Sequence, residues 1–186
     1  ESFKANGATL NKDDKEKYRK LSMDLSMLTL QFDQNALKDK NRFELLITDE
    51  NELSGLPESA RDAAAMLAKS KDKNGWLFNL SAPSYIPFMR YSDKRDLREK
   101  MYREYMSVGN KGDEFDNKDI IKKIVNIRLE IAQLMGFKNY AEYALEHTMA
   151  KNSANVYKLL NQLLEAYKPI AINEYNAVEG FALGTE

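Results

Sequence analysis

The sequence predicts a mainly α fold, a multi-helix array with one short antiparallel β-pair. Apolar residues recur every three or four positions in several long stretches, which is typical of amphipathic helices. Two short runs rich in aromatic or β-branched residues are bounded by turn formers, as strands are. The length of 186 residues suits one domain or two small helical sub-bundles.

The first helix is expected over about residues 11–40. Asn11 can cap its first turn, and an apolar stripe follows at spacings of three and four: Tyr18, Leu21, Leu25, Leu28 and Phe32. The two strands are expected at about 43–48 and 76–80. Between them, Pro57 suits the first position of a helix that continues to about Ser70.

The segment 81–91 is aromatic and contains two prolines, so it is either a short bent helix or an ordered crossing segment. Ser92 or Asp93 then caps a helix that ends near Gly109, and a polar loop spans 110–116. Three further helices complete about six. One runs from Asn117 to Gly136, a short one starts at Asn139, and a long one over about 153–180 is capped by Ser153 and bent by Pro169.

Composition excludes several classes of protein. The 28 basic and 29 acidic residues leave a net charge of −1, so nucleic-acid binding is not expected. With no cysteine there is no disulfide, thiolate nucleophile or Cys-ligated zinc. The apolar runs are too short for a membrane span, and mean hydropathy is −0.61. The compartment, cytoplasmic or periplasmic, stays open. Because the chain starts at Glu1, we expect that an upstream part was removed.

No residue emerges as a catalytic, cofactor-binding or metal-binding site. His147 is the only histidine, and zinc sites need three or four ligands, so it is interpreted as a partly exposed residue at a helix end. The acidic loop 110–119 lacks the glycine and the bidentate glutamate of an EF-hand, so it is interpreted as a solvated loop.

Three other candidate features favour structural explanations. The acidic group Asp49, Glu50 and Glu52 suits helix capping and surface charge better than acid–base catalysis. The aromatic residues of 81–91 could line a peptide cleft, but core packing is favoured for all three: Tyr85, Phe88 and Tyr91. The sequon at 79–81 falls on an expected strand and is interpreted as a chance match.

Several motifs, in order along the chain, resemble the thimet-oligopeptidase family of zinc metallopeptidases, nearest its peptidyl-dipeptidase (dipeptidyl carboxypeptidase) branch. The similarity covers about residues 11–167. It rests on residues 21–37, FELLITDENELSGLPES at 43–59, GWLFNLSAPSYIPFM at 75–89, RDLREKMYR at 95–103, residues 117–132, LMGFKNYA at 134–141 and MAK at 149–151.

The resemblance implies a large helical peptidase whose two halves face each other across a channel, with zinc held by H-E-x-x-H and a downstream glutamate. This sequence has no H-E-x-x-H. We therefore expect the zinc ligands and the general base to lie beyond residue 186. The chain is then a non-catalytic helical scaffold and channel-wall segment, 1–186. It is inactive alone, binds no zinc itself, and has as partners the catalytic half of the parent chain and, in the parent, short peptide substrates.

The alternative is a stand-alone helical protein-interaction module without peptidase chemistry. The last helix bears on both hypotheses because its apolar face is wide. One row is Val156, Leu160, Leu163, Tyr167 and Ile170, and an adjacent row is Tyr157, Leu160, Leu164, Ala171, Tyr175 and Val178. A helix apolar over so wide an arc expects partners on two sides. Alone, the chain is expected to form a weak, concentration-dependent homodimer through the end of this helix at 175–178.

Overall fold

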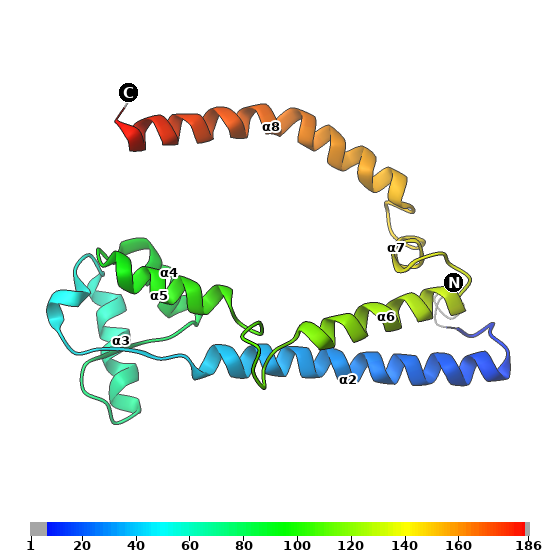
Figure 1. Cartoon of the computed structure of the whole chain (residues 1–186), viewed down its shortest axis with the longest axis horizontal. Coiled ribbons are helices and arrows are strands. Elements are labelled where there is room, and N and C mark those ends of the chain that lie inside the picture. The colour runs from blue at the N-terminus through cyan, green and yellow to red at the C-terminus, as the bar shows by residue number, and fades with distance from the viewer. Residues whose placement is uncertain (1–6, 185–186) are drawn as a thin grey trace. The chain divides into compact units, whose positions relative to one another are not determined.

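The computed structural model describes residues 7–184, and in that span it is mainly α, as predicted, with seven α-helices and one pair of strands (Figure 1). The elements are α2 (Lys12–Arg42), β1 (Leu45–Ile47), the 3₁₀ helix η1 (Glu50–Leu53), α3 (Glu58–Ser70), β2 (Trp76–Phe78), α4 (Ala82–Tyr91), α5 (Arg95–Met106), α6 (Lys118–Leu134), α7 (Tyr140–Leu145) and α8 (Ser153–Leu183).

These elements form two compact units, which are described separately. The central unit comprises Met23–Val125, and the terminal unit comprises the described residues before and after it, 7–22 and 126–184. Helices α2 and α6 each contribute residues to both units. None of the helices that the structure describes is long and apolar enough to cross a membrane.

The two strands of the central unit pair antiparallel, as predicted, but each has three residues and is shorter than expected. Leu45 lies opposite Phe78, and Ile47 lies opposite Trp76. Leu45 and Ile47 are buried while Leu46 between them is exposed, so one face of the pair is in the core. Helix α3 packs against β2 and α4 packs against α3 and α5.

The core of the central unit gathers residues from both strands, η1, α3, α4 and α5. Its buried members are Leu45, Ile47, Leu53, Leu56, Ala64, Phe78, Leu80, Phe88 and Met101. Phe78 and Phe88 meet edge to face with ring centroids 4.8 Å apart, a geometry that aromatic quadrupoles favour. This contact fixes α4 against β2.

The segment left open by the sequence is a helix, α4, which contains both prolines. Pro83 lies in the first turn, where the missing N–H has no helical partner to lose. Pro87 lies inside the helix. The start of this helix is further tied by Ser84, whose Oγ accepts a 3.0 Å hydrogen bond from the Asn79 N–H.

Several helix starts differ from those predicted. Pro57 is the N-cap of α3 rather than its first residue. Helix α5 begins at Arg95 with Lys94 as N-cap, so neither Ser92 nor Asp93 caps it. Ser92 is buried, and its Oγ accepts from the Lys94 N–H in the preceding turn.

Two later helix starts differ as well. The N–H of Lys118 donates to Asp116 Oδ1, and Asn117, the residue at which this helix was expected to start, turns its side chain toward α2. For α8, the capping side chain belongs to Asn152, one residue before the predicted Ser153, and it accepts from the Asn155 N–H.

The terminal unit combines an aromatic cluster with the long helix α8. Phe137 and Tyr140 lie 5.5 and 5.9 Å from Tyr143, ring centroid to centroid. Burial, together with a hydrogen bond to Tyr18, raises the pKa of Tyr143 to about 12. Helix α8 contains Pro169, is visibly curved (Figure 1), and ends where Gly184 adopts a left-handed φ of 67°.

Candidate functional site

The most highly connected polar cluster of the central unit is centred on Asp39, near the end of α2. The Asp39 side chain is fully buried, with 0% exposure. One carboxylate oxygen accepts from Arg42 Nε at 2.7 Å and Lys111 Nζ at 3.2 Å, and the other accepts from the backbone N–H of Gly109 at 2.7 Å. We call Asp39, Arg42, Glu104, Lys111 and Asp113 the Asp39 network.

The outer members of the Asp39 network link the polar loop to α2 and α5. Lys111 also contacts Glu104 at 2.6 Å, and Arg42 also pairs with Asp113. Burial lowers the pKa of Lys111, but its hydrogen bonds to Glu104 and Asp39 outweigh burial and leave that pKa raised. The Arg42 guanidinium lowers the pKa of the Asp113 carboxyl. Opposite charges therefore surround the buried carboxylate.

An amide pair extends this contact along α2. The buried side chain of Asn117 accepts a 3.1 Å hydrogen bond from Asn35 Nδ2 and donates one of 3.1 Å to the Phe32 carbonyl. The hydrogen bonds of the Asp39 carboxylate and of the Asn35–Asn117 pair are all made to other groups of the chain. The arrangement can hold the loop 107–117 against α2, and it presents no free general base or nucleophile.

Acidic side chains of the loop 110–119 form hydrogen bonds and ion pairs with other groups of the chain. Asp116 accepts from the backbone N–H groups of Gly112 and Lys118 and pairs with Lys118 Nζ at 2.8 Å. The side-chain hydrogen bond from Lys118 is the largest cause that lowers the pKa of Asp116 to about 2. Hydrogen bonds therefore hold the loop, and most of its residues are exposed, in agreement with the solvated loop expected.

The only histidine lies just after α7, in the terminal unit. His147 Nε2 is 3.6 Å from a Glu146 carboxylate oxygen, and both side chains are about half exposed. This agrees with the expected histidine at a helix end. Within residues 7–184, no group of three or more His, Cys, Asp or Glu side chains is arranged to hold a metal ion.

The remaining candidates have structural roles. Asp49 caps η1 by accepting from the Asn51 N–H at 2.9 Å, as the capping interpretation predicts. Phe88 is buried, and Tyr85 stacks on Tyr105 with centroids 4.3 Å apart, which confirms core packing for these two. Tyr91 differs because it is 45% exposed.

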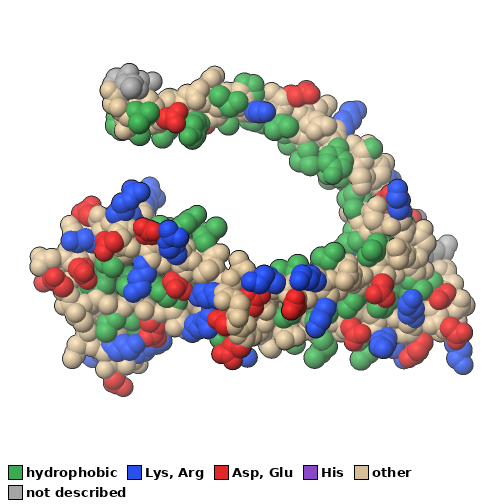
Figure 2. All heavy atoms as spheres, viewed as in Figure 1, with side chains coloured by type: hydrophobic (Ala, Val, Ile, Leu, Met, Phe, Trp, Pro, Cys, Tyr) green, Lys and Arg blue, Asp and Glu red, His purple; other side chains and the backbone are tan. Residues whose placement is uncertain are grey.

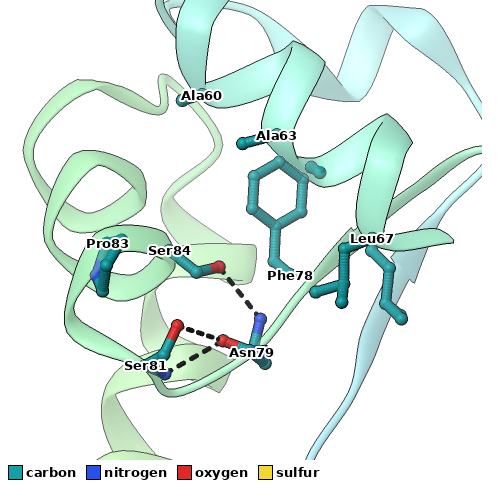
Figure 3. A pocket seen from close by; sticks show the side chains of 10 residues that line it. Ala60, Ala63, Leu67, Phe78, Asn79, Ser81, Pro83 and Ser84 are labelled. Atoms are coloured by element: carbon teal, nitrogen blue, oxygen red, sulfur yellow. Dashed lines mark hydrogen bonds between the residues drawn. The ribbon is translucent and has the colours of Figure 1, made fainter. Parts of the chain in front are cut away.

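The sequon lies just after β2 rather than on it. Asn79 Oδ1 accepts from both the N–H and the hydroxyl of Ser81, at 3.0 and 2.6 Å. Figure 3 shows these contacts at the rim of a cavity of about 140 Å³ between α3 and the start of α4. Its walls are mainly apolar and carry no titratable side chain: Ala60, Ala63, Ala64, Leu67, Leu77, Phe78, Asn79, Ser81, Pro83 and Ser84. It can accommodate a small apolar group but offers no acid–base chemistry.

Comparison with known proteins identifies the family. Residues 88–184 match the model of peptidase family M3. The chain is 38% identical to oligopeptidase A of Haemophilus influenzae over 183 residues, covering 96% of this chain and 27% of the relative. It is 38% identical to a probable cytosolic oligopeptidase A of Arabidopsis thaliana over 183 residues, covering 95% and 26%.

A dipeptidyl carboxypeptidase of Escherichia coli is 29% identical over 174 residues, covering 93% of this chain and 26% of the relative. The mainly α fold and the relatives together define the class of this chain as that of the peptidases it matches. This chain belongs to peptidase family M3, as the sequence motifs predicted. It spans about a quarter of the length of these relatives. The relatives include oligopeptidases and a dipeptidyl carboxypeptidase, and the sequence identity is higher with the two oligopeptidase A relatives.

Proposed function

We propose that this chain is a non-catalytic scaffold and channel-wall segment of a zinc-dependent oligopeptidase that hydrolyses short peptides. The observation that carries the proposal is the 38% identity to oligopeptidase A over 96% of this chain but only 27% of the relative. Most of such an enzyme therefore lies outside these residues. The higher identity to oligopeptidase A than to dipeptidyl carboxypeptidase supports an oligopeptidase as the parent enzyme.

The residues of this chain do not fit the zinc ion that the resemblance implies. Zinc in proteins is held by three or four nitrogen, sulfur or oxygen ligands. The sequence offers one histidine and no cysteine, and His147 has one carboxylate, Glu146, beside it. Zinc binding and peptide hydrolysis are therefore assigned to the rest of the polypeptide, and this chain supplies a rigid support.

The Asp39 network and the central core support the scaffold role. They connect α2, α5 and the start of α6 through contacts that are buried or paired. Such contacts hold backbone elements in fixed positions, which is what a wall lining a substrate channel requires.

The test starts with the natural reading frame. If the proposal holds, the frame that encodes this chain continues into an H-E-x-x-H motif, and its purified product hydrolyses quenched-fluorescent short peptides until a chelator is added. A reading frame without the motif, or a product with no chelator-sensitive hydrolysis, would favour the stand-alone interaction module instead.

A further inference from the structure

Helix α8 exposes an apolar stripe along most of its length. All residues from Tyr157 to Glu179 are exposed. Positions spaced alternately by three and four form one line, which we call the α8 seam: Tyr157, Leu160, Leu164, Tyr167, Ala171, Glu174, Val178 and Phe181. The spacing is that of a heptad pattern over ~36 Å of helix, apolar at every position except Glu174, and it is the pattern by which one helix packs against another.

The curvature of α8 also points to a partner on this side. Pro169 lies on the opposite face of the helix from the α8 seam, and a helix bends away from its proline. Figure 2 shows hydrophobic side chains along the inner side of the curve of α8. Helices generally curve around what they pack against, with the convex side toward solvent.

One position of the α8 seam is charged. Glu174 lies between Ala171 and Val178, and Ile170 is one turn away on the same side. An apolar partner laid on this surface would bury the carboxylate, which is costly unless a cation pairs with it. The partner must therefore present a Lys or Arg side chain at this point.

A second copy of α8 cannot meet this requirement. Parallel pairing in register would place two Glu174 carboxylates together. In antiparallel pairing, Glu174 would lie opposite a residue from the other set of seam positions. That set is every second member of the α8 seam, and it contains no basic residue: Tyr157, Leu164, Ala171 and Val178. Self-association through the seam therefore leaves the carboxylate without a partner in either direction.

We propose that the α8 seam receives an apolar, helix-like segment from the remainder of the same polypeptide, with one Lys or Arg opposite Glu174. This rests on the proposed function, under which the polypeptide extends well beyond this chain. Relatives of which this chain covers 27% contain ample further length to supply such a segment. Ala171, the smallest residue of the seam, lies one turn from Glu174 and allows close approach there.

Amide hydrogen exchange on the longer polypeptide and on the 186-residue chain tests this. Amides of α8 between 160 and 178 should exchange on the order of a hundredfold more slowly in the longer polypeptide. Equal exchange in the two proteins overturns the proposal. The proposal is also overturned if α8 in the 186-residue chain alone becomes, at high protein concentration, as protected from exchange as in the longer polypeptide. A second copy of the chain would then be enough to cover the α8 seam.

Two matched charge reversals test the cation. Glu174→Arg in the longer polypeptide should remove most of the protection of α8, whereas Glu165→Arg, on the opposite side of the helix, should leave it intact. Equal effects of the two variants contradict the assignment of a cation. Chelator-sensitive peptide hydrolysis is measured separately on the unaltered longer polypeptide, and it tests the proposed function. If that polypeptide hydrolyses peptides but the amides of α8 are not protected, this inference is wrong and the proposed function still stands.

Discussion

The backbone N–H of Gly109 donates a 2.7 Å hydrogen bond to the buried carboxylate of Asp39, seventy residues earlier in the chain. This contact joins the loop after α5 to the last turns of α2. Arg42 and Lys111 neutralise the same carboxylate. A buried carboxylate is tolerated only when paired in this way, so the loop and the helix end depend on each other.

Asp39→Asn should destabilise the chain by about 2–4 kcal/mol, because Arg42 and Lys111 lose their shared counter-charge. Urea unfolding followed by circular dichroism measures the loss. Asp33→Asn, at an exposed position of α2, serves as the control and should change stability by less than about 0.5 kcal/mol. Similar losses of stability in the two variants would mean that the Asp39 network contributes nothing to the free energy of unfolding.

Two glycines with left-handed backbone differ sharply in their surroundings. At Gly55, with φ +82°, an added Cβ would lie 2.1 Å from the Tyr91 carbonyl oxygen, whereas at Gly112, with φ +72°, nothing lies within 4 Å. Alanine at either position is strained by the left-handed backbone, but only Gly55→Ala also pushes two backbone segments apart. Gly55→Ala should therefore lower the free energy of unfolding by roughly 1–3 kcal/mol more than Gly112→Ala does. Equal unfolding free energies would show that the approach of Gly55 to Tyr91 is not maintained in solution.

Asp116 should make stability depend on acid pH. Its pKa is lowered from 3.8 to about 2 in the fold, so the folded state binds its proton only at lower pH than the unfolded state. The stabilisation is present above about pH 4 and is lost as pH falls toward 2. Asp116→Asn should therefore be less stable than the unaltered chain at pH 5, with the difference shrinking toward pH 2. A difference that stays constant over this range contradicts the assignment.

The local periodicity of apolar residues predicted the helices, but it could not predict the long-range contacts that hold their ends in place. The apolar stripe of α2 continues at the same spacing through Asn35 and Asp39, which are polar yet buried. This continuation is the sequence signal for the Asp39 network. The partners Gly109 and Lys111 are about seventy residues away, and only tertiary packing brings them to the helix.

Capping residues were ambiguous for the same reason. Asn117 has the side chain of a cap, but burial against Asn35 and Phe32 uses its amide, so Asp116 supplies the cap. Asn139, at which a short helix was expected to start, is the N-cap of α7 and accepts from the Glu142 N–H. No site residue for peptide hydrolysis was predicted, because the sequence contains no H-E-x-x-H motif from which to assign one.

If the proposed partner segment is absent, the exposed end of α8 at 175–178 should form a dimer of this chain that buries of order 1,000 Å². The dimer should be only weak, because a second copy supplies no cation for Glu174. Val178, which is 69% exposed, lies near the end expected to form the contact. Val178→Asp should abolish the dimer, and Gln162→Asp, on the polar side of α8, should not. Light scattering coupled to size exclusion reads the mass. A strict monomer at all concentrations, or a dimer insensitive to Val178→Asp, would contradict this prediction.

Zinc analysis of the purified 186-residue chain, combined with hydrolysis of quenched-fluorescent short peptides, tests most directly whether this segment is non-catalytic. The account predicts far less than one zinc per chain by mass spectrometry and no turnover above the buffer blank, with or without added zinc. Stoichiometric zinc, or turnover that a chelator abolishes, would contradict it and would place a complete active site within these residues.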